Sequence, residues 1–457
     1  MQIIHPENKT LRTMLGDQKP MACVYVPSQF NFILREQETL IFNTFTRMFG
    51  VLEEEEYKLL QDKVSVDSTE DIAPQLRFLI EKRLLVPEGS DEAEIYRQFY
   101  ELIYMMRKPK ELYSYTILTT TACNARCFYC FEADYKPVGM DAKTAEDVAD
   151  YIIAHSNKKN VVRLHWFGGE PLCNTKAMDI ISNKLRDNGF TYSCSITTNG
   201  LLFDSEIVKK AKEDWNVSTV QITLDGMNEE HNRRKNYAAY SGDAFATTIK
   251  HIHGLLDADI TTIVRLNFDM ANVKSIEKLT DFLKDEFGGH PKFASYPAVL
   301  FEDCSAWNPD RLPEEQQTLL KELFRLRDEM QEKNICFPRA LNRDLPLERC
   351  GANNHGHRTI LPNGKFTVCN NVGEADTYGS IYEGITDKEK YERWMNNSCV
   401  LEKCRTCCWL PECTSFDQCP VRRSTCRQEE QDTMTRKVRR DYGNYQKKQQ
   451  AQETAES

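Results

Sequence analysis

The 457-residue sequence lacks both a long apolar run and an excess of positive charge. No apolar segment approaches the about 20 residues that a membrane-spanning helix needs. The first residues, MQIIHPENKTLR, lack the basic start and apolar stretch of a signal peptide. We therefore expect a cytoplasmic protein without a membrane partner. The net charge of -10 disfavours nucleic acid as a partner, because phosphate binding needs clustered lysine and arginine.

Cysteine is plentiful, with 17 residues in the chain. Cytoplasmic thiols stay reduced, so the pattern favours metal ligation over a disulfide framework. Nine cysteines lie between positions 350 and 426, and three lie within positions 123–130. The remaining five have no partner at metal-ligand spacing and are interpreted as core or surface thiols: Cys23, Cys173, Cys194, Cys304 and Cys336.

The segment 123–130, Cys-Asn-Ala-Arg-Cys-Phe-Tyr-Cys, follows a strand-like run. A closed zinc site or a fully ligated [4Fe–4S] cluster takes four protein ligands. The three thiols of Cys123, Cys127 and Cys130 therefore either borrow a distant cysteine or leave one metal coordinate open for chemistry. A zinc site is the alternative interpretation of this loop.

From residue 113 onward, strand and helix patterns alternate. We expect strands at 116–122, 161–167, 190–197, 218–224, 260–268 and 291–299. Asp141, Asn174 and Asp204 stand at predicted helix starts between them. This alternation predicts an α/β fold with a parallel sheet, either doubly wound or a partial barrel.

The cysteine spacing, with an aromatic residue before the third cysteine, resembles radical S-adenosylmethionine (SAM) enzymes. The resemblance implies a partial (β/α)6 barrel over 113–300. It implies that Cys123, Cys127 and Cys130 hold a [4Fe–4S] cluster whose open iron binds SAM. One electron from that cluster then cleaves SAM to a 5′-deoxyadenosyl radical.

The same resemblance implies SAM contacts after the later strands. Gly168, Gly169 and Glu170 match the motif that contacts the SAM amino group, and Asn199 matches a loop near the ribose. Thr223 and Arg265 are expected at the SAM carboxylate, with Arg234 as the competing cation. No residue is assigned to catalysis.

A hairpin is predicted over 359–369, with Asn363-Gly364 at its turn. Cys350, Gly364, Cys369, Cys404, Cys407 and Cys413 together resemble the opening of the SPASM extension, here 348–430. The resemblance implies two auxiliary [4Fe–4S] clusters: Cys350, Cys369 and Cys419 for the first, and Cys404, Cys407, Cys413 and Cys426 for the second. The spacing departs from the pattern between Cys413 and Cys419 and again before Cys426. Cys399, Cys408 or a substrate thiolate are the options for a fourth ligand of the first cluster.

Three further segments, 1–112, 301–347 and 431–457, are interpreted from their hydrophobic and charge patterns. Residues 1–112 predict a small winged-helix-like α+β module, with two strands around the turn 35–38. In peptide-modifying radical SAM proteins such a module often grips a peptide leader, and a packing cap is the alternative. Residues 301–347 predict a bridging helical segment, and 431–457 a charged tail, interpreted as a solvated terminal helix that frays into disorder.

The resemblance implies a radical SAM/SPASM maturase that modifies a ribosomally made precursor peptide, with flavodoxin or ferredoxin as electron donor. The expected product is a thioether or a carbon–carbon crosslink, with epimerisation or oxidation left open. One alternative is an anaerobic sulfatase-maturating enzyme. It is disfavoured because those enzymes carry an aspartate where this chain has Asn370, which cannot act as a base. The other alternative is a zinc-rich scaffold or binding protein, which would be colourless.

Overall fold

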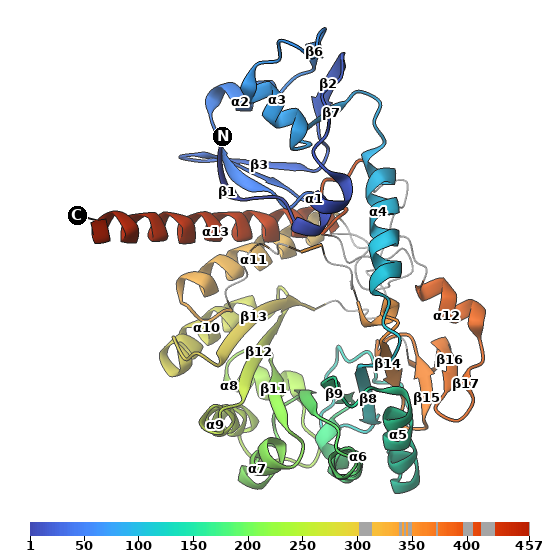
Figure 1. The fold of residues 1–457 in the computed structure, drawn as a ribbon. Helices are drawn as coiled ribbons and strands as arrows, with labels where there is room; N and C mark the ends of the chain where they lie inside the picture. Colours follow the sequence, from blue (N-terminus) through green and yellow to red (C-terminus); the bar gives the residue numbers. More distant parts are fainter. Residues whose placement is uncertain are drawn as a thin grey trace. The chain divides into compact units, whose positions relative to one another are not determined.

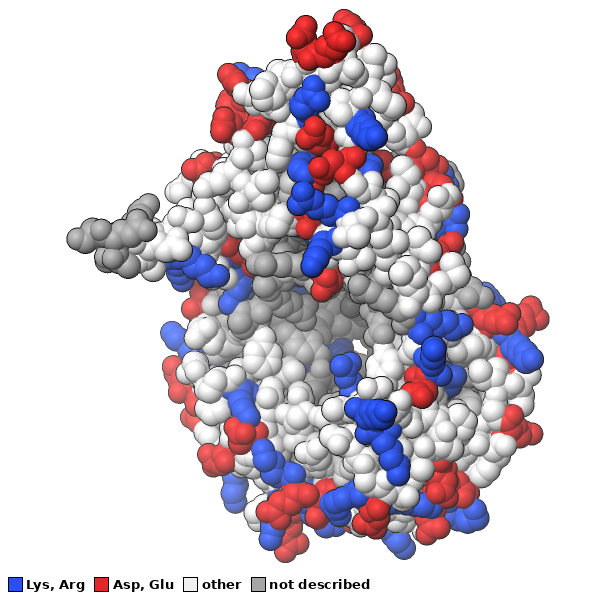
Figure 2. Space-filling view, viewed as in Figure 1, with Lys and Arg blue, Asp and Glu red and all other residues white. Residues whose placement is uncertain are grey.

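The chain forms two compact units in a computed structural model (Figure 1). Unit 1 comprises Met1–Arg107, Pro338–Arg349 and Ser398–Ser457, and unit 2 comprises Lys108–Phe337 and Cys350–Asn397. The structure describes residues 1–300, 313–337, 341, 344–345, 350–371, 373–395, 405–412 and 426–456. Within these ranges, no helix combines the length and apolarity needed to cross a membrane. Basic and acidic side chains are interspersed on the face shown in Figure 2.

Unit 2 is built on six parallel strands that are neighbours in chain order. They are β8 (Ser114–Thr120), β9 (Val162–Gly168), β10 (Tyr192–Thr198), β11 (Val217–Leu224), β12 (Thr261–Phe268) and β13 (Phe293–Val299). All six predicted strands are confirmed at nearly the expected positions. Parallel pairing brings the carboxyl ends of these strands to one edge of the sheet, so the loops that follow them meet there.

Helices follow the six strands, and those predicted to start near Asp141, Asn174 and Asp204 are present. They are α5 (Ala142–His155), η1 (Pro171–Asn174), α6 (Thr175–Asp187), α7 (Ser205–Glu213), α8 (Asn228–Lys235), α9 (Ala244–Asp257), α10 (Val273–Phe287) and α11 (Pro313–Glu332). The Asp141 and Asp204 carboxylates cap α5 and α7 by accepting from the amides of residues 144 and 207. Asn174 precedes α6 but makes no capping bond, because its amide donates to the carbonyls of Thr119 and Met140.

The two faces of the parallel strands differ in polarity. On β10, Tyr192, Cys194 and Ile196 are buried in the same core as residues of α5, α6 and α9. The intervening positions of β10 are serine or threonine and are only half-buried. In Figure 1, α5, α6, α7 and α9 lie along the outer side of the strands. The helices therefore bury one strand face and leave a polar face opposite.

The segment after residue 350 extends this sheet. Its elements are η2 (Gly351–Asn353), β14 (His357–Ile360), β15 (Lys365–Thr367), η3 (Gly373–Asp376), β16 (Thr377–Ser380), β17 (Gly384–Ile385) and α12 (Lys388–Met395). The predicted hairpin is confirmed, with β14 and β15 antiparallel and Gly364 at φ 77° in the turn. β14 also pairs in parallel with β8, from Ser114 to Ile117, a pairing that the local pattern did not predict.

Unit 1 contains two antiparallel sheets. One has the order β1 (Gln2–His5), β5 (Phe49–Leu52), β4 (Thr39–Asn43), β3 (Asn31–Arg35), and the other the order β6 (Val64–Val66), β2 (Cys23–Pro27), β7 (Leu85–Pro87). Its helices are α1 (Lys9–Leu15), α2 (Glu54–Leu59), α3 (Pro74–Glu81), α4 (Glu92–Arg107) and α13 (Cys426–Glu456). The predicted hairpin around residues 35–38 is confirmed, with Arg35 opposite Thr39.

The C-terminal region forms the predicted helix, α13 (Cys426–Glu456), but the helix is not solvated on every side. Met434 and Val438, four positions apart on one helix face, are buried against Phe42 and Phe49 of the first sheet. The predicted extension 348–430 is divided between the units, because Cys350–Asn397 belong to unit 2 and the residues from Ser398 onward to unit 1.

The bridging segment 301–347 is described only in part. The predicted helix is present as α11, and its stripe Leu319, Leu320, Leu323 and Leu326 is buried in the core of unit 2. Residues 301–312, 338–340, 342–343 and 346–349 lie outside the described residues.

Candidate active site

The cysteine loop follows β8 and brings its three thiols close together. Cys123, Cys127 and Cys130 are each half-buried. Burial raises the pKa of the Cys123 thiol to about 12, and the charges of the other two cysteines contribute further. Burial also raises the pKa of Cys127. The metal-free thiols of Cys123 and Cys127 are therefore protonated at neutral pH, and a bound metal would deprotonate them.

The arrangement of the three thiols differs from that of a single-ion site. Within the described residues, no group of three or more histidine, cysteine or acidic side chains converges as the ligands of one metal ion do. In a [4Fe–4S] cluster each cysteine binds a different iron. Such a cluster therefore does not require the three sulfur atoms to converge on one metal ion.

Three neighbouring segments hold the cysteine loop by polar contacts. The Glu170 amide donates to the Ala122 carbonyl at 2.9 Å. The Asn199 side-chain amide donates to the side-chain oxygen of Asn124 at 2.6 Å. After α8, the amide of Ala238 donates to the Asn124 carbonyl at 2.8 Å. The loop is thus fixed by the segments that follow β9, β10 and α8.

The two glycines after β9 permit this close approach. Gly168 has φ 130°, and a Cβ placed there would lie 2.0 Å from the carbonyl oxygen of Thr120. A Cβ on Gly169 would lie 2.6 Å from the carbonyl oxygens of Thr121 and Ala122. These glycines therefore make room for the backbone that carries the cysteine loop.

Glu170 is fully buried between the ends of β9 and β10. Its carboxylate accepts hydrogen bonds from the Thr198 hydroxyl at 2.8 Å, the Asn199 amide at 2.9 Å and the Leu172 amide at 3.2 Å. Burial nevertheless raises the pKa of Glu170 to about 7. Both carboxylate oxygens therefore already have partners within the protein, and a bound ammonium would share them.

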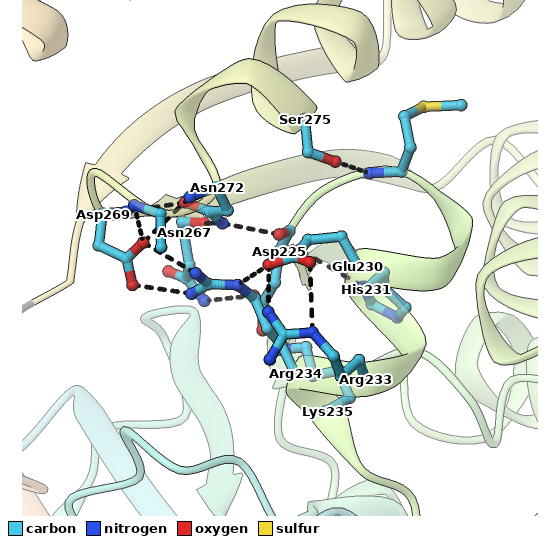
Figure 3. Close-up of polar contacts among 12 residues, drawn as sticks. Asp225, Glu230, His231, Arg233, Arg234, Lys235, Asn267, Asp269, Asn272 and Ser275 are labelled. Carbon is cyan, nitrogen blue, oxygen red and sulfur yellow. Dashed lines mark hydrogen bonds and ion pairs between the residues drawn. The ribbon is translucent and has the colours of Figure 1, made fainter.

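Of the two arginines predicted to bind the SAM carboxylate, Arg265 is the one without an ion-pair partner in the described part of unit 2. It lies on β12 beside Thr223 of β11. Its Nε is buried without a hydrogen bond, and no ion pair links it to any described residue. Arg234, the alternative, donates both terminal nitrogens to Asp269 at 2.8 Å and pairs with Glu230 (Figure 3). An incoming carboxylate would therefore find an unpaired cation at Arg265 and a neutralised one at Arg234.

A buried polar network that the sequence did not predict contacts the loop through Tyr129, and Figure 3 shows its members Asp225, Asn267 and Lys235. Lys235 donates to the Tyr129 hydroxyl at 2.9 Å and to the Thr223 hydroxyl at 2.7 Å. The Tyr129 hydroxyl donates to Asp225 at 2.5 Å, and Asn267 donates to Asp225 at 3.1 Å. The sequence signal for Lys235 was weak, because α8 is polar all round and predicts a solvated helix.

The predicted auxiliary ligands are described only in part. Cys350 is exposed before η2, and Cys369 is half-buried after β15, both in unit 2. Cys407 and Cys408 are half-buried in unit 1. Cys399, Cys404, Cys413 and Cys419 lie outside the described residues, and so does the side chain of Cys426, the first residue of α13. The two auxiliary ligand sets stay predictions.

Residues 117–283 match the Radical SAM superfamily. Similar curated proteins include an uncharacterized protein of Methanocaldococcus jannaschii, 33% identical over 24% of this chain and 37% of its own. The Fe-coproporphyrin III synthase of Methanosarcina barkeri is 26% identical over 36% of this chain and 40% of its own. A protein of Methanococcus maripaludis named "Probable GTP 3',8-cyclase" is 30% identical over 28% and 41%. The match thus spans about two fifths of each of these relatives.

Two solved structures resemble the chain over more of its length. Native anSMEcpe with bound AdoMet and Cp18Cys peptide has a TM-score of 0.55 and 17% identity, covering 73% of this chain and 99% of its own. Streptococcus suis SuiB bound to precursor peptide SuiA has a TM-score of 0.51 and 14% identity, covering 88% and 99%. At this identity the likeness establishes the α/β fold of these radical SAM enzymes.

Proposed function

We propose that this chain, which carries a radical SAM domain at residues 117–283, is an enzyme that modifies a ribosomally made peptide. The observation that carries the proposal is the presence of two features on the strands of one parallel sheet. The loop of Cys123, Cys127 and Cys130 follows β8, and the unpaired guanidinium of Arg265 lies on β12 beside Thr223. Three thiols suit an iron–sulfur cluster with one open iron, and an unpaired guanidinium suits the carboxylate of SAM.

The donor set fits both cofactors of the radical SAM family. Cys123, Cys127 and Cys130 would hold a [4Fe–4S] cluster, which supplies the electron that cleaves SAM when both are bound. Arg265 and Thr223 would orient the SAM carboxylate, and Glu170 would accept from its ammonium. Gly168, Gly169 and Asn199 would keep the cysteine loop in place through the contacts described above. The six parallel strands would form the partial barrel around this site.

Two fold neighbours support a peptide as the substrate. The anSMEcpe structure contains a peptide, and SuiB is bound to its precursor peptide SuiA. The match to SuiB extends over 88% of this chain. We assign leader binding to the N-terminal residues 1–112, and auxiliary clusters to Cys350, Cys369 and Cys419 and to Cys404, Cys407, Cys413 and Cys426. An electron donor such as flavodoxin or ferredoxin would reduce the catalytic cluster.

The proposed product is a thioether or carbon–carbon crosslink within the peptide. Forming either bond removes two hydrogen atoms from the peptide. One leaves as a hydrogen atom taken by the deoxyadenosyl group of SAM. The other leaves as a proton and an electron, and an auxiliary cluster would accept the electron.

The test is the mass of a cysteine-bearing precursor peptide after anaerobic reaction with reconstituted enzyme, SAM and dithionite. We expect a product that has lost two hydrogens and kept its sulfur, and whose cysteine no longer reacts with iodoacetamide if the bond is a thioether. A product in which cysteine has lost its sulfur would instead identify formylglycine formation. An unchanged peptide mass, together with SAM cleavage, would contradict the proposed crosslink.

A further inference from the structure

Lys235 is a buried lysine that contacts the cysteine loop through both its backbone and its side chain. The Lys235 carbonyl accepts from the Arg126 amide at 2.9 Å and lies 3.9 Å from the Cys127 sulfur. Its ammonium donates to the hydroxyl of Tyr129, in the same loop. Only 2% of Lys235 is exposed. A lysine this deeply buried is uncommon and needs a compensating partner.

Asp225 provides that partner at the end of β11. Its carboxylate lies 3.3 Å from the Lys235 ammonium and is itself fully buried. Asn267 and Tyr129 donate to its two oxygens. The pair is therefore a positive and a negative charge, both shielded from water, within reach of the same cysteine loop. Figure 3 shows Asp225, Asn267 and Lys235 among the ends of β11, α8 and β12.

The Lys235 ammonium lies one hydrogen bond from the side chain of Tyr129, which stands between Cys127 and Cys130 in the chain. In a buried site charges are poorly screened, so this positive charge acts on a group held by the loop even at physiological salt. Asp225 carries the opposite charge and acts in the opposite direction.

We infer that Lys235 is a positioning residue that fixes the cysteine loop and raises the reduction potential of the cluster bound there. The inference rests on the proposed cluster at Cys123, Cys127 and Cys130. One-electron reduction adds a negative charge to a cluster, and nearby charge is one of the determinants of its potential. The ammonium stabilises the reduced form and Asp225 destabilises it. A low-potential electron donor therefore reduces this cluster more readily than it would without Lys235.

The test uses opposite charge changes at the two residues in the full-length, iron-loaded protein. Lys235→Gln and Asp225→Asn each keep a hydrogen-bonding group while removing one charge. The midpoint potential is measured by dithionite titration and electron paramagnetic resonance. The signal followed is the one that disappears in the Cys123→Ala, Cys127→Ala, Cys130→Ala triple variant. Lys333→Gln is the matched control, since Lys333 is also a partly buried, ion-paired lysine of unit 2, bonded to Glu329 on α11.

We expect the potential to fall in Lys235→Gln, to rise in Asp225→Asn, and to lie between them in the double variant. Lys235→Arg should stay near the wild-type value, and so should Lys333→Gln. A purely structural role would move both single variants in the same direction. If Lys235→Gln fails to hold the cluster, Asp225→Asn decides alone, because an unchanged or lower potential there overturns the inference.

The triple cysteine variant and the two charge variants test the proposed cluster and the role of Lys235 independently. If the triple cysteine variant keeps all iron and every signal, the proposed cluster is refuted. If the signal is lost in the triple variant but the two charge variants shift together or not at all, the cluster stands and the role of Lys235 is refuted.

Discussion

Gly168→Ala is expected to abolish cluster assembly and SAM binding and to lower the stability of the domain. A Cβ at this position would lie 2.0 Å from the Thr120 carbonyl oxygen, at φ 130°. The contacting oxygen belongs to the backbone and cannot rotate away as a side chain could. The added Cβ would therefore force β8 and β9 apart at the base of the cysteine loop. Overpacking costs about 1–3 kcal/mol, and backbone strain at such a φ adds about 1–3 kcal/mol. Iron content and thermal unfolding measure the two effects.

Gly254→Ala is the control for this substitution. Gly254 lies within α9, and its added Cβ would meet only Val208, at 3.9 Å. Alanine in a helix interior is about 0.5–1 kcal/mol better than glycine, so this variant should be as stable as the wild type or more so. A Gly168→Ala protein that binds iron and SAM normally would contradict the close approach of β9 to the cysteine segment.

Arg265→Met is expected to weaken SAM binding by about 10–100-fold, because a hydrogen bond to a charged group contributes about 1.5–3 kcal/mol. The conservative variant Arg265→Lys should recover part of the affinity, since it restores the charge without the bidentate geometry. Equilibrium binding of SAM to the reconstituted, unreduced protein gives the dissociation constants directly.

Arg234→Met is the matched control, because it makes the same substitution at a second arginine of unit 2. Its guanidinium already pairs with Asp269 and Glu230. Its removal should therefore lower thermal stability and leave SAM affinity within about threefold of wild type, a difference below about 0.7 kcal/mol. The reverse outcome, weak SAM binding in Arg234→Met and normal binding in Arg265→Met, would assign the carboxylate site to Arg234 instead.

Much of unit 2 was predictable from local sequence. Alternating strand and helix patterns gave all six parallel strands, and Asp141 and Asp204 marked helix starts that the structure confirms. The hairpin turn at Asn363-Gly364 was equally readable, because only a few residue types favour its conformation. These features depend on residues close together in the chain.

Features that depend on distant residues were missed. The pairing of β14 with β8 joins His357 to Ser114, and no periodicity reports which strand a hairpin will join. The burial of Lys235 was equally hidden, since charge patterning predicts an exposed lysine and its partner Asp225 lies on another element. The buried face of the C-terminal helix was also missed, because Met434 and Val438 are sparse among charged residues and the helix was predicted to be solvated.

The glycine pair after β9 has a structural role that the sequence did not reveal. The resemblance assigns the motif to a SAM contact, which stays a prediction. In the structure the two glycines lie against the carbonyls of Thr120, Thr121 and Ala122. A sequence shows that a small residue is present, and only the fold shows what approaches it.

The most direct measurement of the central claim is iron and labile sulfide per chain on anaerobically purified protein, beside the triple variant Cys123→Ala, Cys127→Ala, Cys130→Ala. One catalytic and two auxiliary [4Fe–4S] clusters predict about twelve irons, falling to about eight in the variant. If the wild type holds fewer than twelve irons but the variant still loses about four of them, a cluster on the cysteine loop is supported. An unchanged iron content in the variant, or a colourless protein with zinc in place of iron, would contradict the account.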